Sequence, residues 1–224
     1  MTGGWARAYD HLPYFLSFLL SGAIMTVIVT AGGFIAAIIF GIIFAGLKTS
    51  NARMARSFAF LYVEVFRAVP VLTQLFIIYF GLATIGIKLS PIPAAILGFG
   101  LNGGAYLTEV FRAGIEAVDR GQTEAALSIG MTRLMALRYI VLPQATRVVL
   151  PPIANFAIGL LKDTSLASAV AAPELSFNAH MLVNETFLST QIYVIVALFY
   201  LAMSLPLASV SRRLERRAKR GQRT

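Results

Sequence analysis

The sequence predicts an all-α integral membrane protein with about five transmembrane helices. Two observations carry this prediction. Of the 224 residues, 58% are hydrophobic and 13% are charged, whereas soluble domains average about half apolar and a quarter charged residues. The apolar residues are also collected in runs that reach the roughly 20 residues a helix needs to cross a bilayer. The composition therefore excludes a soluble globular domain.

Five apolar runs define the expected spans. In chain order they are Phe15–Leu47, Val69–Ile87, Ile92–Phe111, Tyr139–Leu161 and Gln191–Val210. The first run is longer than a bilayer requires, so we expect it to tilt or to begin as an interfacial helix. It lacks a strongly basic leader and a clear small-residue cleavage site, so we treat it as a retained span rather than a signal peptide.

The distribution of positive charge predicts the orientation of these spans. Of the 19 Lys and Arg residues, only Arg7, Lys88 and Lys162 fall in the connections on one side. The others, Arg67 among them, follow the first span, surround the third connection or lie in the tail at 212–224. Because Lys and Arg gather in cytoplasmic segments, we expect the N-terminus outside and the C-terminus in the cytoplasm. The net charge of +9 then reflects topology and contact of the tail with anionic membrane lipid, and no nucleic-acid partner is expected.

One glycine pattern suggests nucleotide binding but lies in the wrong context. Gly98, Gly100 and Gly103 match G-x-G-x-x-G, which binds dinucleotides where it follows a strand and opens a helix. Here it lies inside the third apolar run, so we interpret it as a packing face that lets helices approach closely. A Walker A loop and cysteine are absent, and His11 and His180 lie far apart. We therefore expect no cofactor, no metal site and no ATP binding by this chain.

A polar stretch between the third and fourth runs has a definite pattern. Residues 124–143 have the sequence EAALSIGMTRLMALRYIVLP. The first residues favour a helix, whereas Gly130 tolerates a left-handed backbone and can end one short helix and start another at an angle. Apolar residues over Leu134–Ile140 then recur at helical spacing, and Pro143 suits the first turn of the next span. These features predict a rigid L-shaped projection; on the residues alone, an ordinary solvated loop is the alternative.

The same stretch resembles the cytoplasmic loop of ABC importer permeases, which has the pattern EAA-x3-G-x9-I-x-LP. Every fixed position is present, from Glu124 to Pro143. Three more segments resemble this family or its polar amino acid branch: Val65–Gln74, Ala105–Gln122 and Leu161–Leu166. Ala68 and Ala113 depart from the family pattern, since glycine is usual after each preceding arginine. The resemblance covers about residues 20–212.

The resemblance implies a transport subunit rather than an enzyme, in one transmembrane domain at 1–224 with a basic cytoplasmic tail at 212–224. It implies a cytoplasmic ABC ATPase dimer that drives transport, an extracytoplasmic solute-binding protein, a polar amino acid as substrate, and a bacterial cytoplasmic membrane that the chain crosses several times. Five helices alone make a poor aqueous path, so a second permease subunit, identical or homologous, is expected. The residues expected to contact the ATPase are Glu124, Ala125, Ala126, Gly130, Met131, Thr132 and Arg133.

Polar residues inside apolar runs are costly in a bilayer and therefore mark functional sites. The candidates for the substrate path are Gln74, Asn102, Asn155, Asp163, Thr164 and Ser165. Asp163 would accept the ammonium group of a zwitterionic substrate, and the adjacent hydroxyls and Gln74 would donate to its carboxylate. Backbone freed at Pro151–Pro152 would line a cavity. The alternative is a structural role, and pairs such as Glu109 and Arg112 would neutralise each other.

Two other functional classes remain as alternatives. An intramembrane enzyme would need convergent catalytic groups, and the sequence has neither H-E-x-x-H nor a pair of intramembrane aspartates. A membrane scaffold without a transport path would not need the polar residues of the second and fourth spans. Within transport, the sequence leaves glutamine, glutamate, histidine, arginine, cystine and opine-like solutes open, and either a homodimeric or a heterodimeric pore.

Overall fold

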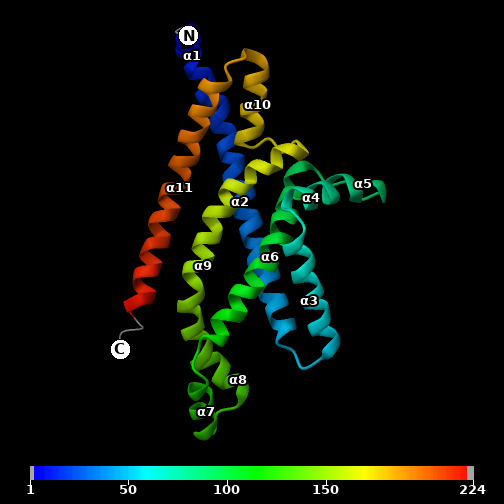
Figure 1. The fold of residues 1–224 in the computed structure, drawn as a ribbon, viewed down its shortest axis with the longest axis vertical. Helices are drawn as coiled ribbons and strands as arrows, with labels where there is room; N and C mark the ends of the chain where they lie inside the picture. The colour runs from blue at the N-terminus through cyan, green and yellow to red at the C-terminus, as the bar shows by residue number, and fades with distance from the viewer. Residues whose placement is uncertain (1–2, 221–224) are drawn as a thin grey trace.

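Long helices running roughly along one axis form the body of the molecule (Figure 1). The computed structural model describes residues 3–220, and the regular elements in that range are all helical. The long helices are α2 (Leu12–Lys48), α3 (Arg53–Ala68), α6 (Pro91–Glu116), α9 (Leu142–Asp163) and α11 (Ser189–Arg220). The first and last described residues lie toward opposite ends of the bundle (Figure 1). The all-α prediction is confirmed.

The second predicted span is not a straight helix. Among the described residues, α2 and the part of α11 up to Arg216 are each long and apolar enough to cross a membrane. A third crossing requires α3 joined to the following segment, and these two are bent by 107°. That segment consists of α4 (Val71–Phe76), the π-helical η1 (Ile77–Gly81) and α5 (Leu82–Thr84). It points sideways out of the bundle, whereas α3, which precedes the bend, runs along it (Figure 1). The prediction of a membrane span over Val69–Ile87 is therefore wrong.

Proline at the bend gives the physical reason. Pro70 lacks an N–H and disfavours helical geometry in the residue before it, and Val69 is accordingly extended, with φ −89° and ψ 132°. The bend also changes the placement of Arg67, which was assigned to the same side as Arg53. These residues lie near opposite ends of α3, about 21 Å apart along a helix that rises ~1.5 Å per residue. The assignment of Arg67 to that side is therefore wrong.

Glycines allow α2 and α6 to pack closely. A Cβ built on Gly100 would lie 2.5 Å from the Cβ of Ala36, and one built on Gly103 would lie 2.4 Å from the ring of Phe156. Such distances leave no space for a side chain, so these positions require glycine. The G-x-G-x-x-G pattern is therefore a helix-packing face, as its context predicted.

The connection between α9 and α11 is folded, which the sequence did not suggest. It contains the 3-10 helix η3 (Thr164–Val170) and α10 (Leu175–Thr186). Glu174 is fully buried and caps α10 by accepting hydrogen bonds from the backbone N–H groups of Ser176 and Phe177, at 2.9 and 2.8 Å. The hydroxyl of Tyr200 on α11 donates to the same carboxylate at 3.3 Å. A buried cap with donors from two helices fastens α10 to the end of the bundle.

Two short helices extend beyond the opposite end. α7 (Arg120–Ser128) and α8 (Arg133–Ala136) lie past the last turn of α6 (Figure 1). The π-helical segment η2 (Leu137–Val141) leads from α8 directly into α9. At the C-terminus, α11 continues through the predicted basic tail as far as Arg220, and residues 221–224 of that tail lie outside the described residues.

Candidate functional site

A left-handed glycine turns the chain between α7 and α8. Gly130 has φ +88°. Its N–H donates to the carbonyl of Leu127 at 3.0 Å, and the N–H of Met131 donates to that of Ala126 at 3.1 Å. This pair of bonds is the Schellman arrangement that ends helices with a left-handed residue. The role predicted for Gly130, ending one short helix before another, is confirmed.

The second short helix has its own cap and packs against the first. The hydroxyl of Thr132 accepts a hydrogen bond from the N–H of Met135 at 3.3 Å, which satisfies one of the donors left free at a helix start. Ala126 on α7 and Ala136 on α8 are both buried, so small side chains allow the two arms to approach. We call residues 120–141 the α7–α8 projection. Its caps and its packing give it a defined shape.

Pro143 lies in the first turn of α9, as predicted, but the chain is already helical before it. In η2 the N–H of Leu142 donates to the carbonyl of Leu137, five residues earlier. A proline ring normally clashes with the carbonyl four residues before it, and a π-helical turn widens the helix at that point. The projection is therefore joined to α9 by continuous helix rather than by a flexible loop.

Large apolar side chains are exposed on this projection. Ile129 is 76% exposed and Leu134 is 73% exposed, and they stand on either side of Gly130 in the sequence. Exposed apolar groups on a polar, structured projection are typical of a protein contact surface. From the sequence, Leu134 was predicted only to belong to a helical repeat, and neither it nor Ile129 was predicted to contact the ATPase. Their signal was the occurrence of two large aliphatic residues beside a turn glycine in a polar segment.

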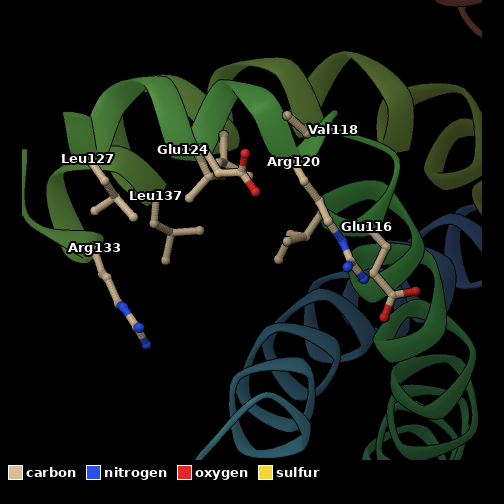
Figure 2. Close-up of a pocket in the computed structure, with 10 residues that line it drawn as sticks. Glu116, Val118, Arg120, Glu124, Leu127, Arg133 and Leu137 are labelled. Atoms are coloured by element: carbon tan, nitrogen blue, oxygen red, sulfur yellow. The ribbon is translucent and has the colours of Figure 1, made fainter. Parts of the chain in front are cut away.

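A cleft of about 650 Å³ lies inside the angle of the projection. The end of α6, α7 and the start of the α8–η2 segment form its walls. Figure 2 shows Glu116 and Arg120 on one side, Leu127, Leu137 and Arg133 on the other, and Glu124 between them. Of the predicted contact residues, Glu124 and Arg133 line this cleft. Ala126 is instead buried under it.

Four charged residues connect the end of α2 with this cleft. Lys48 pairs with Glu109 on α6. Arg112 binds Glu109 through Nη2 at 2.8 Å and Glu116 through Nη1 at 2.6 Å. We call these four residues the ion-pair chain. The expected neutralisation of Glu109 by Arg112 is confirmed, but the sequence did not reveal that Lys48 and Glu116 extend it.

Gln74 and Asn102 meet at the bend between α3 and α4. The amide nitrogen of Gln74 donates to the carbonyls of Phe66 and Val69, at 2.9 and 2.8 Å. The amide nitrogen of Asn102 donates to the same Phe66 carbonyl at 2.8 Å. These carbonyls lose their helical partners because the chain bends at Pro70. Both side chains thus hold the bend, which is the structural alternative to their predicted place in a substrate path.

The remaining substrate-path candidates are dispersed. Asn155 accepts a hydrogen bond from the hydroxyl of Ser211 on α11 at 2.8 Å. The hydroxyls of Thr164 and Ser165 donate to backbone carbonyls three residues earlier, at 2.7 and 2.8 Å. Asp163 is exposed at the end of α9. The prediction that Thr164 and Ser165 donate to a substrate therefore requires these local bonds to be exchanged.

Comparisons with known proteins agree with this architecture. The model of the family described as "binding-protein-dependent transport system inner membrane component" matches residues 37–220. The chain is 37% identical to the L-cystine transport system permease protein TcyB of Bacillus subtilis, over 98% of this chain and 95% of the relative. It is 33% identical to the glutamine transport system permease protein GlnP of Escherichia coli, over 98% and 99% of the two chains.

Solved structures show the same fold. A chain from the crystal structure of an amino acid ABC transporter with histidines is 34% identical and superposes with a TM-score of 0.88, covering 97% of this chain and all of the other. A chain of the MetNI methionine ABC transporter in an inward-facing conformation gives a TM-score of 0.65 at 16% identity, which shows likeness of fold alone. The family resemblance of the EAA stretch is confirmed. The protein belongs to the family of inner membrane components of binding-protein-dependent transport systems.

Proposed function

We propose that this chain is the permease subunit of an ATP-driven importer of polar amino acids in a bacterial cytoplasmic membrane. It is a transport component rather than an enzyme, and a separate subunit hydrolyses ATP. The observation that supports the coupling role is the α7–α8 projection, a capped two-helix structure with exposed Ile129 and Leu134 beside a charged cleft. A docking site for a driving subunit needs a rigid shape and an apolar contact, and this projection has both.

The proposed orientation places the projection in the cytoplasm. The connection between α2 and α3 and the last turns of α6 lie toward the same end of the bundle as the projection (Figure 1). These segments carry Lys48, Arg53 and Arg112, and Lys and Arg mark the cytoplasmic side. The N-terminal end, with α1 (Gly3–Asp10) and α10, then lies outside, where a solute-binding protein would dock. Exposed apolar side chains line much of α2, which suits contact with lipid and with a second permease subunit.

The proposed substrate class is based on the names of the similar proteins. Their printed names include amino acid, glutamine and L-cystine permeases, and we carry over polar amino acids as a class. The six substrate-path candidates stay within this proposal, with Asp163 as the group to test first because its carboxylate is exposed.

Reconstitution tests this function. The chain is purified with its ATPase, placed in proteoliposomes that contain ATP, and given the solute-binding protein with tritiated glutamine, glutamate, histidine, arginine or cystine. We expect accumulation of at least one of them, dependent on both ATP and the binding protein, and reduced by Asp163→Ala. Vesicles with an ATPase that cannot hydrolyse ATP are the control. Failure of all five to accumulate, or accumulation without ATP, would contradict the proposal.

A further inference from the structure

The ion-pair chain joins the end of one long helix to the wall of the cleft. Glu109, Arg112 and Glu116 are spaced three and four residues apart, so they share one face of α6. Lys48 is the last residue of α2, and its ion pair with Glu109 connects α2 to α6. At the other end, Glu116 lines the cleft. The four residues therefore form a continuous link from the end of α2 to the part of the cleft wall that α6 supplies.

The burial of these side chains decreases toward the cleft. Lys48 and Glu109 are 20% and 21% exposed, whereas Glu116 is 61% exposed. Fully exposed pairs contribute little because solvent screens them, but partly buried networks hold their geometry better. Since Glu109 contacts both Lys48 and Arg112, it is the member that connects the last residue of α2 to the rest of the ion-pair chain.

The chain also determines the charge that the cleft offers. Arg112 neutralises Glu116 through their ion pair at 2.6 Å. The other charged residues of the lining are Arg120, Arg133 and Glu124. The cleft is therefore left with a net positive lining, which suits an acidic group of a docked partner.

We propose that Lys48 and Glu109 are positioning residues for coupling: the ion-pair chain fastens α2 to the cleft wall, so a displacement of the docked ATPase moves α2 and α6 as one body. This inference rests on the proposed function. Without the Lys48–Glu109 pair, the cleft would still bind the ATPase and α6 would still pack against α2, but the last turn of α2 would lose its ionic contact with α6 and would follow the movement less closely. Coupling would weaken while docking remained.

The experiment separates docking from coupling. Because the chain contains no cysteine, Thr123→Cys introduces a unique thiol into the cleft lining. Labelling by a maleimide in detergent, with and without the ATPase, reports docking. In proteoliposomes, ATP hydrolysed per amino acid taken up reports coupling, with a tritiated mixture of the protein amino acids and cystine as the probe.

We expect Lys48→Met to keep the maleimide protection and to raise the ATP consumed per amino acid about fivefold. Lys48→Arg retains the charge and should stay near the unaltered ratio. Lys88→Met is the matched control, since Lys88 precedes the first turn of α6, whereas Glu109, Arg112 and Glu116 lie toward the last turns of that helix. If Lys48→Met does not assemble, Glu109→Gln removes the same ion pair from the α6 side, with the same expected direction.

An unchanged ratio in Lys48→Met, or in Glu109→Gln where that variant replaces it, would overturn the inference and leave the proposed function standing. If the ATPase does not protect the introduced thiol in the otherwise unaltered chain, docking at the cleft is wrong, and the proposed coupling role fails with it. The two failures are therefore distinguishable.

Discussion

Gly130 offers a direct test of the turn in the projection. It has φ +88°, and a Cβ added to it would meet no atom within 4 Å. A side chain at this position therefore costs backbone strain alone, without a steric clash. For alanine the strain of a left-handed backbone is about 1–2 kcal/mol. Asparagine tolerates this region better, and a β-branched residue tolerates it least.

The substitutions Gly130→Asn, Gly130→Ala and Gly130→Val should therefore form an ordered series. Hydrogen exchange measures the local effect at the amide of Met131, which donates to Ala126 in the turn. Each 1.4 kcal/mol is a tenfold change in an equilibrium, so we expect protection to fall about fivefold to thirtyfold for alanine, less for asparagine and more for valine. Coupling of ATP hydrolysis to uptake should decrease in the same order.

Gly159→Ala is the matched control. Gly159 also has open space around it, but it lies inside α9 with ordinary helical geometry, where alanine is favoured over glycine by about 1 kcal/mol. We expect this change to leave coupling intact. If Gly130→Val transports as efficiently as the unaltered chain and the amide of Met131 keeps its protection, neither the turn nor coupling depends on a left-handed residue at this position.

Three other changes probe separate parts of the molecule. Gln74→Leu removes two hydrogen bonds at the α3–α4 bend. This change should lower the free energy of unfolding by about 1–3 kcal/mol, which would be seen as a lower thermal midpoint in detergent. Loss of uptake at unchanged stability would instead favour a substrate contact, and Gln144→Leu, at an exposed amide, is the control. Leu134→Glu should release the ATPase during co-purification. Met54→Glu, at a residue that is also highly exposed but lies outside the projection, should not. If both variants retain the ATPase, the proposed apolar contact through Leu134 is wrong. Burial, opposed by hydrogen bonds from the backbone, raises the pKa of Glu174 from 4.5 to about 7. Because the folded protein holds this proton more tightly than the unfolded chain does, stability should fall as the pH rises through about 4.5 to 7, and the thermal midpoint of Glu174→Gln should lose that part of the pH dependence.

Local patterns in the sequence were sufficient for several features. The turn at Gly130 depends on backbone preferences of a few adjacent residues, which the sequence displays. The glycines of α6 were assigned to packing because no strand precedes them, and the contacts of Gly100 and Gly103 confirm it. Membership of the permease family followed from spacing in the EAA stretch, a linear pattern that needs no fold.

Features that join distant residues were not predictable in the same way. Gln74 and Asn102 were selected because polar groups in apolar runs are costly, but the carbonyl of Phe66 that satisfies both is visible only once the chain bends. Asn155 faces Ser211, which is 56 residues away. The position of these polar residues within apolar runs drew attention to them, but it did not reveal their partners.

The sequence alone determined that the chain is helical, that its helices suit a bilayer, that the polar stretch turns at Gly130 and that the chain belongs to its family. The length of an apolar run and the backbone preference of a residue are local properties, so both can be predicted directly from the sequence. Only the tertiary structure decided that the second span is bent at Pro70, that Glu174 is buried under α10 and that Lys48 reaches the cleft through Glu109. These features depend on which distant groups meet, and a charge or an amide is stabilised by its neighbours in space rather than by its neighbours in the chain.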